Sequence, residues 1–125
     1  MENKMVLSNL PHTWIFDLDG TIVKHNGYKS GGDEWLPGAL ELLQSIPEDD
    51  YVLFLTARDS SIASGTEKFL RDSNVRYNKI IYGIPMGERI MFNDSKPSGL
   101  KMSYAVECKR DDGLEWFSFN FDDTL

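Results

Sequence analysis

The chain has little cysteine and no long apolar run. Cys108 is the only cysteine in 125 residues, so no disulfide can form within the chain. We therefore expect a reducing, cytoplasmic setting and a structural rather than catalytic thiol. No apolar run approaches the roughly 18 residues that a membrane-spanning helix needs, so we expect no membrane partner. The first dozen residues also lack the basic start and apolar stretch of a secretory signal, and we expect no leader.

Positive charge is scarce as well. Thirteen lysines and arginines face 20 acidic residues, which gives a net charge of -7. Proteins that bind nucleic acid without sequence preference need a basic face, so we expect no nucleic-acid partner. A small anionic substrate stays compatible, because a divalent cation and a few local cations can reverse the field at one site. The length and the 41% hydrophobic content fit a single domain over residues 1–125.

Short apolar runs alternate with stretches of helical spacing along the chain. The runs predict strands, and the stretches predict helices over residues 36–45 and 60–72. Residues 98–106 fit either a helical turn or a strand. Such alternation predicts an α/β fold, a Rossmann-like three-layer sandwich whose central, mainly parallel sheet is covered on both faces. The predicted strands are Thr13–Asp17 and residues 51–56, 79–82, 89–92 and 114–121.

Polar side chains follow three of these predicted strands at the point where each strand ends. Because the carboxyl ends of parallel strands meet at one edge of a sheet, we expect these side chains to lie close together. Two carboxylates one residue apart point to the same face of a strand and favour a bound cation. The three groups are Asp17 with Asp19, then Thr56 with Ala57 and Arg58, then Asn93 with Asp94.

Three acids, a hydroxyl beside free amides and a nearby lysine suit phosphoryl transfer. Mg²⁺ prefers oxygen ligands and keeps several waters, so one or two carboxylates are enough to hold it. A further carboxylate can act as a nucleophile and form an aspartyl-phosphate. The metal and the lysine then neutralise charge on the transferring group.

These motifs resemble those of the haloacid dehalogenase superfamily of phosphatases. The match consists of Asp-Leu-Asp-Gly-Thr at 17–21, Phe-Leu-Thr-Ala-Arg at 54–58 and Asn-Asp at 93–94. The resemblance implies that Asp17 is the nucleophile and a Mg²⁺ ligand. It implies that Asp19 is the general acid and base, with its main-chain carbonyl on the metal. Thr56 and the Ala57 amide would bind the phosphoryl group, and Asp94 would complete the metal site.

The chain departs from that family in two ways. Ile84 stands where some relatives carry a lysine in Gly-Lys-Pro, so Lys96 is the first substitute and Lys79 the second. The intervals between motifs are also too short for a folded cap domain, so the chain resembles a small capless member. The glycine-rich loop over residues 24–34 is then either a lid or an ordinary surface loop. Lys24 and Arg58 lie near the predicted mouth as possible substrate contacts.

The predicted function is that of a Mg²⁺-dependent phosphatase. Its partner would be a small phosphorylated metabolite, such as a sugar phosphate or a nucleotide-sugar precursor. The alternative is a non-catalytic regulatory module that binds phosphate or a phosphoprotein on the same fold, and a weaker alternative is a phosphatase acting on a macromolecule. Capless relatives often use a neighbouring subunit as a lid, so a homo-oligomer is possible. The ending at 119–125 echoes the first motif, but Asn120 replaces the nucleophile, which favours an acidic tail or an edge strand.

Overall fold

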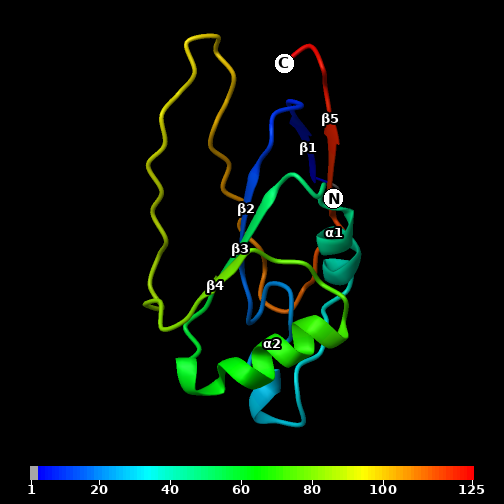
Figure 1. Cartoon of the computed structure of the whole chain (residues 1–125), viewed down its shortest axis with the longest axis vertical. Helices are drawn as coiled ribbons and strands as arrows, with labels where there is room; N and C mark the ends of the chain where they lie inside the picture. The colour runs from blue at the N-terminus through cyan, green and yellow to red at the C-terminus, as the bar shows by residue number, and fades with distance from the viewer. Residues whose placement is uncertain (1–2) are drawn as a thin grey trace.

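The computed structural model describes residues 3–125, which form two small parallel sheets and two α-helices (Figure 1). The larger sheet has the order β2-β3-β4, and β1 pairs with β5 in the smaller one. Among residues 3–125, neither helix is long and apolar enough to cross a membrane. The elements are β1 (Asn3–Leu7), β2 (Thr13–Asp17), η1 (Gly27–Lys29), α1 (Ala39–Ser45), β3 (Tyr51–Leu55), η2 (Ser60–Ile62), α2 (Ala63–Asp72), β4 (Lys79–Ile81) and β5 (Phe117–Phe121).

Strands β2 and β3 confirm the two strongest strand predictions. They pair in parallel from Thr13 beside Tyr51 to Asp17 beside Leu55. Asp17 therefore lies at the carboxyl end of β2, and Thr56 directly follows the residue paired with it. Both positions sit at the edge of the sheet where functional groups were expected.

The predicted helices are present with small differences at their starts. Helix α1 begins at Ala39 rather than at residue 36, because Gly38 at its N-cap has a left-handed φ of 81°. The second helix covers the predicted span as η2 followed by α2. Its start is capped as expected, since the Asp59 carboxylate accepts a hydrogen bond from the Ser61 amide.

The hydrophobic core lies on one face of the larger sheet. Phe16 and Phe54 point into it with Leu43 of α1 and Leu70 of α2, and Phe54 and Leu70 are at most 1% exposed. On the opposite face Ile15 and Tyr51 remain 47% and 43% exposed. The fold is therefore mixed α/β with parallel sheets, as predicted, but helices cover the larger sheet on one face only.

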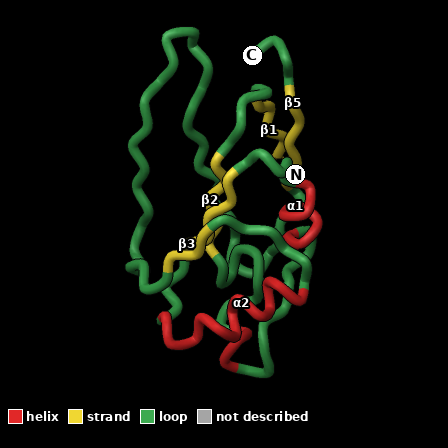
Figure 2. Tube along the Cα trace, in the orientation of Figure 1, coloured by secondary structure: helices red, strands yellow, loops and turns green. Residues whose placement is uncertain are grey.

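A long loop replaces the predicted fourth strand. Residues 84–107, here called the arm, leave the end of β4, extend along one side of the molecule and return (Figures 1 and 2). The strand prediction for residues 89–92 was wrong for this structure, and residues 98–106 form neither a helix nor a strand. Ile90 and Phe92 are 80% and 92% exposed. A run of strand-forming residues becomes a strand only where another backbone pairs with it, and none pairs here.

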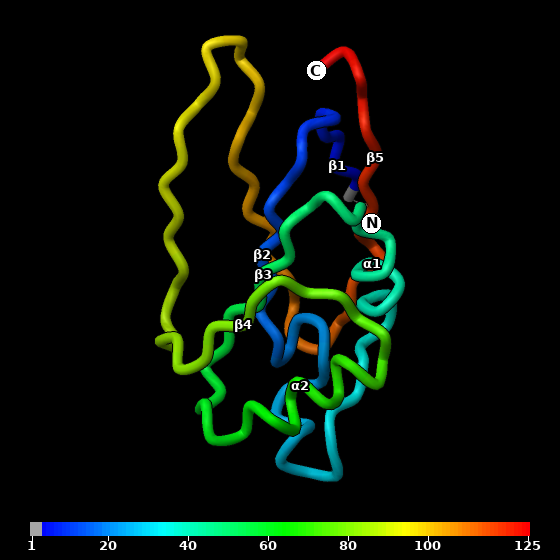
Figure 3. Tube along the Cα trace, viewed as in Figure 1, coloured from blue at the N-terminus to red at the C-terminus, as the bar shows by residue number. Residues whose placement is uncertain are grey.

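The smaller sheet joins the two ends of the described chain (Figure 3). Strand β5 confirms the last predicted strand over a shorter span, and Asn120 lies within it beside Val6. The echo of the first motif is thus part of an edge strand. Strand β1 was not predicted, because its only partner is β5.

The buried carboxylate of Asp50, directly before β3, binds β2 and the residue that precedes β2. Asp50 is 4% exposed and accepts hydrogen bonds from the Trp14 indole at 2.9 Å and from the His12 amide at 2.9 Å. The His12 ring lies 3.0 Å from its second oxygen. Burial raises the pKa of Asp50, but the hydrogen bonds and the charge of His12 outweigh it and leave the pKa below its ordinary value.

Candidate functional site

Asp17 occupies the carboxyl end of β2 with its side chain 36% exposed. One carboxylate oxygen accepts a hydrogen bond from the Thr21 hydroxyl at 3.3 Å. The other lies 3.1 Å from a guanidinium nitrogen of Arg89, which belongs to the arm. The turn after β2 is tight, since Gly20 has a φ of 85° and its amide donates to the Val23 carbonyl. The predicted nucleophile is therefore accessible but already paired with a cation.

Asp19 lies two residues further on and is held by a different arginine. Both of its oxygens accept hydrogen bonds from Arg58, at 3.0 and 2.9 Å. The same guanidinium donates to both oxygens of Asp33, at 3.0 and 2.7 Å, and to the Thr66 hydroxyl. Arg58 thus joins two carboxylates from different segments into one ion-pair network.

Arg58 is part of the interior rather than of a substrate-binding surface. Its side chain is 2% exposed, and its guanidinium lies 4.3 Å from the centre of the Tyr28 ring. Burial lowers the pKa of Arg58, but the two carboxylates outweigh it and the pKa is raised. The structure does not bring Arg58 to the mouth of the site. Instead, Arg58 fixes the loop over residues 24–34 through Asp33 and Tyr28.

Thr56 lies next to Asp17 but turns its hydroxyl inward. It is 1% exposed, and its oxygen accepts a hydrogen bond from the Arg58 amide at 3.0 Å. Ala57 is exposed, and its amide has no hydrogen-bond partner among residues 3–125. An amide of this kind is available to an anion, whereas the Thr56 hydroxyl must first exchange its present bond.

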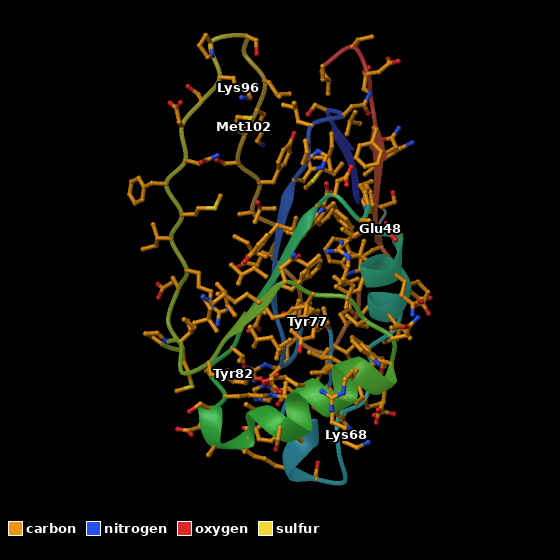
Figure 4. All side chains as sticks on the ribbon, in the orientation of Figure 1. Glu48, Lys68, Tyr77, Tyr82, Lys96 and Met102 are labelled. Carbon is orange, nitrogen blue, oxygen red and sulfur yellow. The ribbon has the colours of Figure 1, made fainter. Side chains whose placement is uncertain are left out.

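The arm carries two predicted site residues away from the sheet edge. Asp94 and Lys96 are exposed, and Figure 4 shows Lys96 near the tip of the arm beside Met102, at the end of the molecule far from α2. The Asn93 side chain donates to the Met102 carbonyl within the arm, at 3.1 Å. The expectation that Asp94 and Lys96 lie beside Asp17 is therefore not met in this arrangement.

The other two lysines also lie outside the site. Lys79 is level with Leu53 of β3 and Ile15 of β2. It therefore lies two residues before the carboxyl edge of the sheet, on the strand that β3 separates from β2. Lys24 is exposed, and its amide donates to the Glu34 carbonyl. The cation that the structure places at Asp17 is an arginine, which sequence reasoning did not consider.

Three residues of the site were missed from the sequence. Arg89 and Asp33 form the ion pairs described above, and the stem of Arg110 lies against Gly20, 3.2 Å from where a β-carbon would stand. No periodicity or motif marks such contacts between distant exposed segments.

The oxygen donors suit Mg²⁺ chemically, but the structure does not gather them. Among residues 3–125, no group of three or more His, Cys, Asp or Glu could hold a metal ion. Of the two acids in the first motif, Asp17 is the more exposed, at 36% against 18% for Asp19. Burial raises the pKa of the Cys108 thiol, and the negative charge of Asp17 raises it further. Mg²⁺ thus fits Asp17 in chemistry and exposure, provided that it takes the place of Arg89.

Comparison with known proteins adds nothing to this geometry. No family model matches the chain, and neither curated proteins nor solved structures yield a match.

Proposed function

We propose that this chain is a cytoplasmic, Mg²⁺-dependent phosphatase of the haloacid dehalogenase type. Its substrate is a phosphate monoester of a small metabolite, such as a sugar phosphate or a nucleotide-sugar precursor. The observation that carries the proposal is the position of Asp17. Its carboxylate is accessible at the carboxyl edge of a parallel sheet, two residues from Asp19 and beside Thr56 and the free amide of Ala57.

The chemistry divides between the two aspartates. A carboxylate oxygen of Asp17 attacks phosphorus, the bond to the ester oxygen breaks, and Asp19 gives its proton to the departing alkoxide. Asp19, again a carboxylate, then takes a proton from water, which attacks the aspartyl-phosphate and releases inorganic phosphate and Asp17. Arg58 orients the Asp19 side chain with two hydrogen bonds. Mg²⁺, held by Asp17, the Asp19 carbonyl and Asp94, would supply neutralising charge.

Asp94 and Lys96 join the site if residues 89–93 pair with the free edge of β2. That edge carries no other strand among residues 3–125, and a groove of about 860 Å³ runs along it. The groove is lined by every residue of β2 and by apolar side chains of the arm, including Met91, Met102 and Tyr104. Exposed apolar side chains concentrated in one segment indicate a surface that is buried in another arrangement.

The chain between β4 and residue 89 is long enough for this pairing. Seven residues, 82–88, reach about 24 Å when extended. The path back to the start of a strand beside β2 is about 21 Å, from a strand length of about 16 Å and three strand spacings. That connection would cross the bare face where Ile15 and Tyr51 are exposed. We therefore keep the three-layer sandwich as part of this proposal, with residues 82–88 as the layer on the second face of the larger sheet.

Substitution of the nucleophile tests the proposal. Asp17→Asn should abolish release of phosphate from p-nitrophenyl phosphate and from a panel of phosphorylated metabolites in the presence of Mg²⁺. Asp112→Asn, which removes an exposed acid from the turn at Asp112, serves as the control and should keep full activity. Full activity of Asp17→Asn would remove Asp17 from the mechanism.

The alternative, a non-catalytic binding module, is favoured by one observation. Both carboxylates of the first motif are already paired with a guanidinium, Asp17 with Arg89 and Asp19 with Arg58. A module of this kind would bind inorganic phosphate or a phosphoprotein and release none. Absence of turnover across the whole panel, together with phosphate binding measured by calorimetry, would favour it over the phosphatase.

A further inference from the structure

The ion pair between Arg89 and Asp17 connects the arm to the carboxyl end of β2. Within residues 3–125 it is the one side-chain hydrogen bond between the arm and a segment distant in sequence, since the Cys108 thiol donates only to the Val106 carbonyl two residues away. The remaining polar contacts of the arm's side chains stay within it, such as Asn93 with Met102 and Lys101 over Tyr104. The polar attachment of the arm to the sheet edge therefore rests on the pairing of Arg89 with the predicted nucleophile.

This ion pair and the proposed pairing of residues 89–93 with β2 exclude each other. A strand parallel to β2 that brings Asp94 level with Asp17 places Arg89 five residues back, about 16 Å toward the start of the strand. An arginine side chain reaches less than half that distance. Asp17 can therefore face Arg89 with the arm extended, or Asp94 with the arm paired, but not both.

We propose that Arg89 is an internal counter-ion that competes with a divalent cation for Asp17 and so weakens metal binding at the site. In the extended arrangement the guanidinium occupies the oxygen of Asp17 that a metal would take. When the metal binds Asp17, Arg89 leaves, and the arm is free to pair with β2 and deliver Asp94. This inference rests on the proposed function, because it takes Asp17 as the metal ligand.

Because the Arg89–Asp17 pair is exposed to solvent, a metal ion can break it. Both side chains are about one-third exposed, at 34% and 36%. Pairs of this exposure shift an equilibrium by about fivefold at most, because solvent screens them. Arg58, with a side chain 2% exposed and bonds to two carboxylates, is held far more firmly and cannot act in this way. A ligand changes the populations only by its difference in affinity for the two arrangements, and Mg²⁺ at Asp17 has such a difference.

Calorimetric titration of the full chain with MgCl₂ measures the competition directly. Arg89→Gln should bind Mg²⁺ about three- to fivefold more tightly than the native chain. Arg89→Lys keeps the charge and should restore the native affinity. Lys101→Gln removes a positive charge from the arm without touching Asp17, and it should leave the affinity unchanged. Far-UV circular dichroism checks that each variant is folded.

Limited proteolysis with chymotrypsin follows the arm itself. Cleavage after Phe92 and Tyr104, both exposed, should slow as Mg²⁺ is added, and in Arg89→Gln it should slow at a lower Mg²⁺ concentration. Unchanged or weaker Mg²⁺ binding by Arg89→Gln, with binding lost in Asp17→Asn, would overturn the counter-ion role and leave the proposed function standing. Native Mg²⁺ affinity in Asp17→Asn would instead remove the metal site on which both depend.

Discussion

Replacing Arg58 by methionine tests the ion-pair network beneath the site. The substitution keeps most of the side-chain volume but removes all five N–H donors. Asp33 and Asp19, with side chains 7% and 18% exposed, then face each other without a cation. Removing one partner of a buried ion pair costs about 3–5 kcal/mol. Because water reaches part of Asp19, we expect the lower end, about 3 kcal/mol.

Urea denaturation followed by tryptophan fluorescence measures this loss, which corresponds to a melting temperature about 12 °C lower. Arg71→Met, at an exposed position of α2, is the matched control and should change the free energy of unfolding by less than about 0.5 kcal/mol. Adding Asp33→Asn to Arg58→Met removes one unpaired charge and should recover at least about 1 kcal/mol. A loss below about 1 kcal/mol in Arg58→Met would refute the reasoning, since it would mean that water already solvates both carboxylates.

Three further predictions concern stability and reactivity. Hydrogen bonds lower the pKa of Asp50, so the stabilisation that its carboxylate provides is present above about pH 4 and lost as the pH falls. The urea midpoint of Asp50→Asn should therefore depend less on pH between about 5 and 3 than that of the native chain. Equal pH dependence of the two midpoints would contradict this. Cys108 has a raised pKa, so iodoacetamide should modify it at pH 8 more slowly than it modifies glutathione, and equal rates would contradict its burial. Gly113→Ala places a β-carbon 2.4 Å from the Pro37 carbonyl oxygen at a φ of 77°, so it should lower the free energy of unfolding by more than about 2 kcal/mol. Gly65→Ala in α2 meets nothing within 4 Å and should raise it by about 0.5–1 kcal/mol. Thermal unfolding measures both changes.

The elements predicted from the sequence are those fixed by local pattern. Strand β3 is a continuous apolar run, and α2 has a capping aspartate and helical spacing, so neighbours in sequence determine both. Asp17 could be located because it ends such a run. The position of Asp19 followed from the same motif, although its partner Arg58 did not.

The features that were missed depend on contacts between distant segments. Residues 89–92 have the composition of a strand, but composition alone does not decide whether this segment pairs with the free edge of β2 or stays in the arm. The pairing of Arg89 with Asp17 joins two residues 72 positions apart, and no spacing rule connects them. The three-layer arrangement stays a prediction for a related reason, since alternation of strands and helices does not say which face of the sheet each helix covers.

The pairing of β1 with β5 has a consequence for how the chain folds during synthesis. These strands lie more than a hundred residues apart in sequence, and their register runs from Asn3 beside Phe117 to Leu7 beside Phe121. The chain up to Phe121 must therefore have left the ribosome before β1 can complete its pairing. Until then its unpaired backbone is a target for chaperones or for other nascent chains. Closing so long a loop is slow, so we expect the smaller sheet to form last and to set the folding rate.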